Sequence, residues 1–158
     1  MSSYTGRLQG EGLRVAVVTS RFNDLVTDRL RAGCLDGLTR HGVDGASISE
    51  VSVPGALELP LAAQRMAVSG EVDAVVCIGA VIRGSTDHHL HVGGQCAAGV
   101  ARVQLDTGVP VVFCVLTTDD LAAALERAGG KMGNKGYEAA ATAVEMADLL
   151  SQLPKSSG

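Results

Sequence analysis

Four short apolar runs recur along the chain, and a stretch with helical periodicity follows each of them. The runs begin at Arg14 (RVAVVTS), Ser47 (SISEVSV), Asp73 (DAVVCIGAV) and Pro110 (PVVFCVL). Strands that alternate with helices are typical of a parallel sheet. The first, third and fourth runs are apolar almost throughout, as expected of strands covered on both faces. The second run alternates polar and apolar residues, which makes it the expected edge strand.

Five stretches with apolar residues three and four positions apart predict helices. They cover residues 24–42, about 57–68, about 89–107, about 121–128 and about 137–150. The sequence therefore predicts an α/β fold, a three-layer flavodoxin-like sandwich in which helices flank a four-stranded parallel sheet on both faces. At 158 residues the chain is expected to form a single domain, 1–158, with residues 1–12 and 152–158 flexible.

The composition narrows the classes of partner. Hydrophobic residues make up 46% of the chain, yet no apolar run approaches the roughly 18 residues that span a bilayer, and the N-terminus lacks the apolar stretch of a secretion signal. The net charge of −4 is spread without long runs, whereas a nucleic-acid backbone requires a clustered positive face. Four cysteines, scattered among apolar neighbours, are expected to be reduced and buried. We therefore expect a cytoplasmic protein that binds neither membranes nor nucleic acid.

Unusual polar segments follow all four predicted strands. TSRFN ends the first strand, VPGALE the second, GAVIRGSTDH the third and VLTTDD the fourth. In open parallel sheets, ligands bind in a crevice outside the carboxyl ends of the strands. The sequence therefore predicts a ligand-binding site along this one edge.

Phe22 and Glu58 are candidates at this edge with more than one interpretation. An exposed aromatic ring can stack on a planar ligand, but a loop aromatic that packs against the core explains Phe22 as well. Glu58 falls near a helix N-terminus, where it can bind a ligand, cap the helix or pair with the helix dipole. The residues alone leave both positions open.

The third predicted strand and the region after the fourth carry the signs of a phosphate site. Gly84, Ser85 and Thr86 precede a helix, where amides and hydroxyls suit an anion, although a simple helix cap has the same composition. Arg127 follows the fourth strand, and arginine can grip phosphate with two parallel hydrogen bonds. The Walker signature is absent, which excludes a P-loop nucleotide enzyme.

Three histidines, His88, His89 and His91, follow the third strand. His88 and His91 are three positions apart and Asp87 adds an oxygen donor, so a metal site is one interpretation of the cluster. No H-E-x-x-H motif and no second ligand cluster accompanies them. One imidazole that carries protons beside an anion loop is the more economical interpretation, because histidine changes charge near neutral pH. We therefore expect no metal, and the other two imidazoles at the surface.

Several spaced motifs in one order closely resemble the 6,7-dimethyl-8-ribityllumazine synthase family of riboflavin biosynthesis: SRFN, VPGALELP, GAVIRGSTDH, VLTT and RAGGKMGNKGYEAA followed by AVEM. The likeness covers about residues 14–150 without large gaps. It implies a transferase that condenses 5-amino-6-ribitylamino-uracil with 3,4-dihydroxy-2-butanone 4-phosphate. The product is 6,7-dimethyl-8-ribityllumazine, and phosphate and water are released without cofactor or metal.

The resemblance also implies roles for individual residues. Six residues would hold the pyrimidine substrate, by stacking on the ring, by contact with the ribityl chain or by backbone bonds to the ring: Phe22, then Gly55, Ala56 and Glu58, then Val81 and Ile82. Ser85, Thr86 and Arg127 would bind the phosphate. His88 would move protons during imine formation and elimination, which leaves His89 and His91 as the histidines expected at the surface.

An oligomer is the third implication of the resemblance. Family members work as pentamers, some of which pack twelve at a time into sixty-subunit shells, and the product passes to riboflavin synthase. Phe113 and Lys135 would close the pocket from the neighbouring subunit. A monomer should therefore be inactive.

The segment after His88 departs from the family pattern. An aromatic residue, an acidic residue and a further aromatic or histidine are usual, whereas His89, Leu90 and His91 stand here, and Gln95 replaces a common glutamate. The change removes carboxylates that can orient an imidazole or tune its basicity. Two alternatives thus stay open: a related enzyme with a different carbonyl substrate, and a non-catalytic shell that binds flavin or lumazine.

Overall fold

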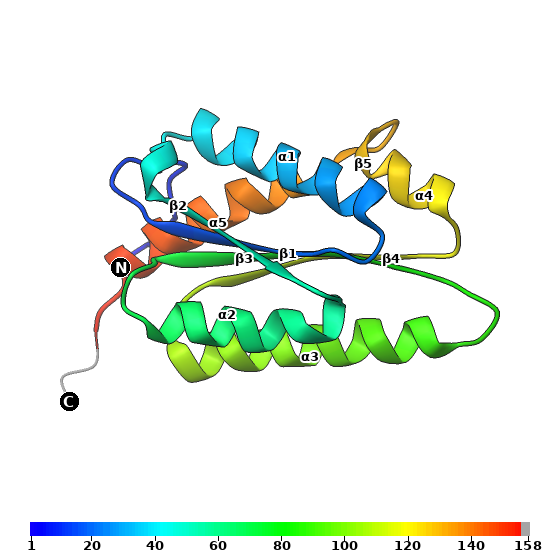
Figure 1. The fold of residues 1–158 in the computed structure, drawn as a ribbon. Helices are drawn as coiled ribbons and strands as arrows, with labels where there is room; N and C mark the ends of the chain where they lie inside the picture. The colour runs from blue at the N-terminus through cyan, green and yellow to red at the C-terminus, as the bar shows by residue number, and fades with distance from the viewer. Residues whose placement is uncertain (156–158) are drawn as a thin grey trace.

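The computed structural model of the chain describes residues 1–155, and a four-stranded parallel sheet forms its centre (Figure 1). The strands are β1 (Val15–Ser20), β2 (Ile48–Val53), β3 (Ala74–Ile82) and β4 (Val111–Thr118), in the order β2-β1-β3-β4. β1 and β3 are the central strands, and β2 lies at one edge as its alternating pattern predicted. The predicted α/β fold with a four-stranded parallel sheet is therefore confirmed.

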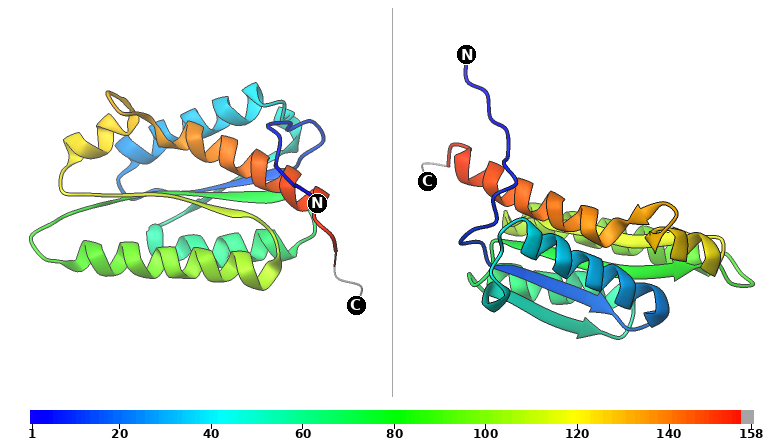
Figure 2. Two further views of the ribbon diagram at one scale, coloured as in Figure 1. Left: turned by 180° about the vertical axis from the view of Figure 1, so that it is seen from behind. Right: turned by 90° about the horizontal axis from the view of Figure 1, so that it is seen from above.

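Helices cover both faces of the sheet (Figure 2). They are α1 (Asp24–Arg40), α2 (Leu59–Val68), α3 (His88–Thr107), α4 (Leu121–Glu126) and α5 (Lys135–Gln152). α1, α4 and α5 cover one face, and α2 and α3 cover the other. Within residues 1–155, no helix combines the length and the apolar character needed to cross a membrane.

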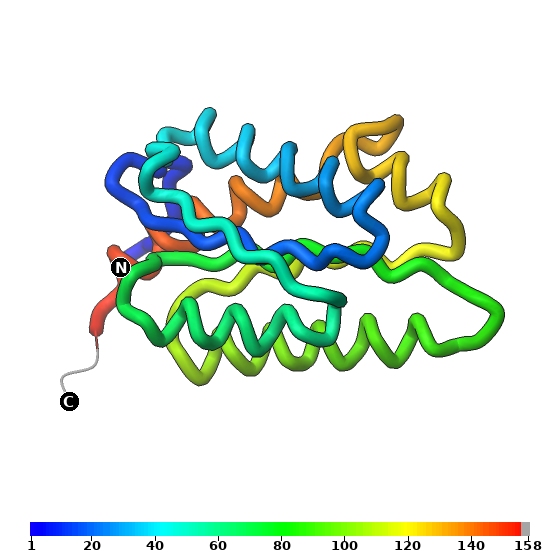
Figure 3. Tube along the Cα trace, viewed as in Figure 1, coloured from blue at the N-terminus to red at the C-terminus, as the bar shows by residue number. Residues whose placement is uncertain are grey.

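Strand order explains this division, because parallel crossovers are right-handed. From β1 to β2 the chain steps in one direction along the sheet, whereas from β2 to β3 and from β3 to β4 it steps in the other. Figure 3 traces the chain from α1 above the sheet to α2 and α3 below it. The first crossover helix, α1, therefore lies opposite α2 and α3. Alternate residues of β1 serve the two cores: Val15 and Val17 pack under α1 and α5, and Ala16 and Val18 pack against α2 and α3.

β4 is apolar almost throughout, but it is not a central strand of the sheet. It forms the second edge of the sheet, and Phe113 on it is 41% exposed. A continuous apolar pattern reports that both faces of a strand are covered, and says nothing of whether another strand pairs with its edge. The single chain thus leaves an apolar strand open along one side.

The region after β4 contains a small hairpin that helical periodicity did not predict. α4 ends at Glu126, and β5 (Ala128–Gly130) pairs with β6 (Gly133–Asn134) in an antiparallel ladder. Gly129 and Gly133 have φ of 106° and 81°, which suits a tight turn because glycine tolerates positive φ. Asn134 Oδ1 accepts from the amides of Gly136 and Tyr137 at 2.8 and 3.1 Å, so that α5 begins before the predicted residue 137.

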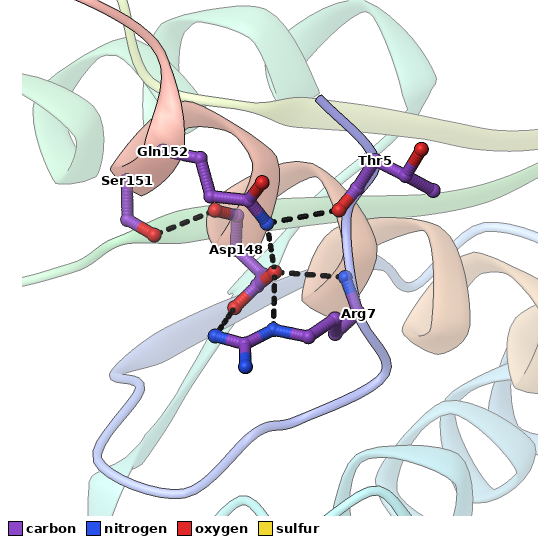
Figure 4. A network of polar contacts seen from close by, with 5 residues as sticks. All are labelled: Thr5, Arg7, Asp148, Ser151 and Gln152. Carbon is purple, nitrogen blue, oxygen red and sulfur yellow. Dashed lines mark hydrogen bonds and ion pairs between the residues drawn. The ribbon is translucent and has the colours of Figure 1, made fainter. Parts of the chain in front are cut away.

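The N-terminal segment is tied to the end of α5 (Figure 4). It contains no helix or strand over residues 1–12, but the amide of Arg7 donates to Asp148 Oδ2 at 2.8 Å and its guanidinium pairs with Oδ1 at 3.4 Å. Gln152 donates to Asp148 Oδ2 and to the carbonyl of Thr5 at 2.8 and 2.9 Å. The flexibility expected of residues 1–12 and 152–158 stays a prediction; residues 156–158 of that tail lie outside the described part of the chain.

This contact predicts a pH dependence of stability. The amide and guanidinium of Arg7 hold the pKa of Asp148 below its usual range. A carboxylate with a lowered folded-state pKa stabilises the fold fully above its unfolded value, about 3.9, and loses that contribution as pH falls through the folded value. We expect Asp148→Asn to lower the unfolding midpoint by a constant amount above about pH 5, and the difference from wild type to shrink below about pH 4. Thermal unfolding of both proteins from pH 3 to 7 measures this difference in midpoint. The control variant is Asp106→Asn, on the surface of α3.

The four cysteines, Cys34, Cys77, Cys96 and Cys114, are buried and free, as predicted. Burial raises the pKa of Cys96 to about 11 and those of Cys34 and Cys114 to about 12. Burial raises the pKa of Cys77 further still. Thiols of this kind are packing residues rather than nucleophiles, because the thiolate is the reactive form.

Candidate active site

A cavity of about 400 Å³, which we call the Phe22 pocket, opens at the carboxyl ends of the strands. The turn after β1, the segment from Gly55 to Glu58, the end of β3 and the first turn of α3 form its walls. All of the predicted site residues except Phe113, Arg127 and Lys135 line it. The structure therefore gathers most of the predicted site in one cavity.

The turn after β1 holds Phe22 at the mouth of this pocket. The amide of Phe22 donates to the carbonyl of Pro54 at 3.1 Å, and Asn23 Nδ2 donates to the carbonyl of Ala80 at 2.8 Å. These bonds tie the turn to the segments that follow β2 and end β3. The ring of Phe22 is 72% exposed, so it does not pack in the core. Packing against the core is therefore excluded for Phe22 in the single chain, and its role as a stacking surface stays a prediction.

Glu58 lies at the junction of a short 3-10 helix, Ala56–Glu58, and α2. It occupies the N-cap position of α2, but its side chain makes no capping hydrogen bond. A Cβ on Gly55 would lie 3.2 Å from Glu58 Oε1, so the carboxylate lies beside Gly55 in the wall of the pocket. The side chain of Glu58 is exposed and is free to accept from a ligand.

The segment between β3 and α3 offers unused donors. Ser85 and Thr86 are exposed, and within residues 1–155 their amides take part in no hydrogen bond. Thr86 Oγ1 accepts from the amide of His88 at 3.3 Å. Free amides at the start of a long helix favour an anion, because the helix dipole is positive there. The exposed imidazole of His88 opens α3 beside these groups.

Arg127, Phe113 and Lys135 line a different cavity, of about 770 Å³, which we call the Arg127 pocket. β4, α4 and the start of α5 enclose it. Arg127 Nη1 donates to the carbonyl of Ala123 at 2.8 Å, and Lys135 Nζ lies 3.3 Å from Glu138 Oε2. Within one chain, Arg127 therefore does not share a pocket with Ser85 and Thr86. The reason is topological: α4 lies on the α1 face of the sheet, whereas α3 covers the other face.

Among the polar side chains that line the Phe22 pocket, sequence reasoning missed those of Asn23 and His89. Asn23 has a φ of 64°, and its sequence signal is that asparagine tolerates this left-handed conformation after a strand. His89 is only 8% exposed, so the expectation that it lies at the surface is wrong. The burial of His89 could have been predicted from its helical spacing to Gly93, Cys96 and Val100, which form the sheet-facing stripe of α3. His91 is exposed, as expected.

The described residues, 1–155, contain no group of three or more His, Cys, Asp or Glu side chains placed to hold a metal ion. The three histidines after β3 therefore divide by position rather than converge. His88 is exposed at the pocket, His89 is buried in its wall, and His91 faces solvent outside both pockets.

Comparison with known proteins identifies the family of the chain. The family model described as 6,7-dimethyl-8-ribityllumazine synthase matches residues 12–151. A relative named 6,7-dimethyl-8-ribityllumazine synthase, from Syntrophus aciditrophicus (strain SB), is 53% identical over 148 residues, which is 94% of this chain and 96% of the relative. The match spans the whole sheet and both pockets. The chain therefore belongs to the 6,7-dimethyl-8-ribityllumazine synthase family.

Proposed function

We propose that this protein condenses 5-amino-6-ribitylamino-uracil with 3,4-dihydroxy-2-butanone 4-phosphate to form 6,7-dimethyl-8-ribityllumazine. We further propose that the Phe22 pocket of one chain and the Arg127 pocket of a neighbouring chain form one active site. A single observation carries the second proposal. The stacking surface, the anion loop and His88 lie in one pocket, whereas the cation expected to bind the phosphate lies in the other.

The open edge of the sheet supports a neighbouring chain at this place. β4 has an unpaired edge, Phe113 on it is 41% exposed, and the Arg127 pocket runs along the same strand. An open apolar edge is a liability that proteins cover, and exposed apolar surface marks interaction sites. A second copy on this edge would bury Phe113 and bring Arg127 to the site of the neighbour. Lys135 would enter the shared site in the same way.

The residues have separate tasks in the proposed reaction. Phe22 stacks on the pyrimidine, Gly55, Ala56 and Glu58 face the ribityl hydroxyls, and the backbone of Val81 and Ile82 bonds to the ring. The 5-amino group attacks the butanone carbonyl, and the resulting carbinolamine loses water to form an imine. The binding contacts hold both substrates in place while the imine forms, before the phosphate leaves.

The later steps need proton transfer and an anion site. Removal of a proton from the carbon chain expels phosphate and leaves an enol, which tautomerises to a ketone. The ribityl-bearing nitrogen then attacks this ketone and closes the ring with loss of a second water. His88 carries the protons, because an imidazole accepts and donates near neutral pH. Ser85, Thr86 and Arg127 hold the departing phosphate, whose charge grows as the bond breaks. These steps are additions, eliminations and one tautomerisation, so the reaction requires no redox cofactor.

We also propose that the protein forms pentamers and lies in the cytoplasm. A ring of five chains gives every chain a neighbour on both sides, and such pentamers can pack into a sixty-subunit shell. The product would pass to riboflavin synthase. Four free, buried cysteines suit a reducing compartment, which supports a cytoplasmic location.

Mixed assemblies test the shared site. His88→Ala and Arg127→Ala, each almost inactive alone at low substrate, are co-expressed at equal levels with different affinity tags, and mixed particles are purified. About a quarter of the interfaces then pair an intact Phe22 pocket with an intact Arg127 pocket, so activity should return to about a quarter of wild type. The rise of lumazine absorbance measures it. No recovery in verified mixed particles would show that each site belongs to one chain.

The same assay separates the alternatives for the reaction itself. Phosphate release without a lumazine spectrum would point to a different carbonyl chemistry. Tight lumazine binding without turnover by the wild-type protein would point to a binding shell.

A further inference from the structure

His89 is a buried imidazole at a helix position that usually holds an apolar side chain. It begins the stripe of α3 that faces the sheet, and the later members of this stripe are Gly93, Cys96, Val100 and Val103. A polar ring in such a stripe costs stability unless its nitrogens find partners. The site described above gives no role to this side chain.

The two ring nitrogens of His89 differ in their surroundings. Nδ1 is fully buried, and within residues 1–155 it has no hydrogen-bond partner. Nε2 is not among the sealed, unpartnered atoms, and none of the hydrogen bonds within the described residues engages it. Because His89 lines the Phe22 pocket, Nε2 is the nitrogen that is open to a ligand there.

The burial of Nδ1 also favours one tautomer. A buried N–H without a partner forfeits a hydrogen bond that water would otherwise supply, and a ring nitrogen that carries no proton forfeits less. The proton is therefore best placed on Nε2. Through Nε2, His89 then presents an N–H donor to the pocket.

We propose that His89 is a substrate-binding residue that donates a hydrogen bond from Nε2 to an uncharged acceptor on the ribitylamino-pyrimidine. This inference rests on the proposed function. A single N–H donor suits the carbonyl oxygens of the pyrimidine or the hydroxyl oxygens of its chain. A phosphate dianion is better served by several donors and a cation, which Ser85, Thr86 and Arg127 supply.

The position of α3 supports this choice of substrate. The helix packs on the segment Ala56–Glu58 as well as on β3 and β4. The sheet-facing side of its first turn therefore looks toward the walls assigned to the ring and the ribityl chain. The phosphate donors Ser85 and Thr86 lie before this turn, in the exposed loop.

The test compares substrates and variants in the full-length assembled protein. His89→Phe keeps a ring and removes the N–H, His89→Gln keeps a side-chain N–H, and His91→Gln is the surface control. Calorimetry measures the Kd for 5-amino-6-ribitylamino-uracil alone, and steady-state assays measure KM for each substrate. We expect His89→Phe to weaken pyrimidine binding by about 2- to 10-fold, as for one neutral hydrogen bond, and to leave KM for the butanone phosphate nearly unchanged.

The controls decide between binding and packing. His89→Gln should recover part of the affinity, and His91→Gln should bind as wild type. A folded His89→Phe protein that binds the pyrimidine as tightly as wild type overturns the proposal, as does an equal rise of KM for both substrates. If His89→Phe does not fold, His89→Met removes the same donor with a side chain that adapts its shape. A wild-type protein that binds the pyrimidine but forms no lumazine contradicts the proposed function, while the Kd comparison still decides the role of His89.

Discussion

His88→Ala is expected to lower kcat for lumazine formation by about 10²- to 10⁴-fold, the usual cost of removing a general acid-base group. The imidazole opens α3, is exposed and lines the Phe22 pocket, so it can reach a bound substrate without rearrangement of the fold. KM for both substrates should change much less, because proton transfer acts in the transition state rather than in binding. Initial rates at saturating concentrations of both substrates measure the effect.

His91→Ala is the matched control for this prediction. It removes an imidazole three residues further along the same helix, but that side chain is exposed and lines neither pocket. Its kcat should stay within about twofold of wild type. A kcat of His88→Ala within about threefold of wild type would contradict the assignment, because one imidazole would then not carry the protons.

Arg127→Ala is expected to raise KM for 3,4-dihydroxy-2-butanone 4-phosphate by about 10- to 150-fold. This range corresponds to a charge-assisted hydrogen bond of about 1.5 to 3 kcal/mol. The guanidinium gives one hydrogen bond to the carbonyl of Ala123 at 2.8 Å, and no other protein partner occurs within residues 1–155. The remaining donors of its planar fork are thus available for phosphate. KM for the pyrimidine should change little, since that substrate carries no phosphate.

Two variants sharpen this test. Arg127→Lys keeps the charge but loses the two-pronged geometry, so its KM should fall between wild type and Arg127→Ala. Lys131→Ala removes a nearby exposed cation that lines neither pocket, and should leave both KM values unchanged. An equal rise of both KM values in Arg127→Ala would point to a disturbed pocket rather than to a lost phosphate contact.

Much of the fold was predictable because local burial leaves a local pattern. The runs at β1 and β3 are apolar on both faces, and β2 alternates because it lies at an edge. The β5–β6 hairpin was not predictable in the same way, since a turn built on Gly129 and Gly133 has no periodicity. The open edge of β4 was also hidden, because the apolar faces of this strand look the same whether or not another strand pairs beside it.

The candidate site also has features that the sequence predicts and features that it does not. The residues of TSRFN, VPGALE and GAVIRGSTDH share the carboxyl edge of three strands, so their proximity follows from the parallel order alone. The exposure of Phe22 and the burial of His89 depend instead on contacts between elements far apart in the chain. Periodicity could place His89 on a stripe of α3, but it could not show that this stripe ends at a cavity.

The alternation of strands and helices, the sheet edge that carries the candidate site and the family of the chain could all be predicted from the sequence. These are properties of segments, and each segment carries its own pattern of burial and polarity. That Arg127 and His88 line separate pockets became visible in the three-dimensional fold alone. The face that a crossover helix covers depends on the direction in which the chain steps between strands, and strand order is a property of the whole chain.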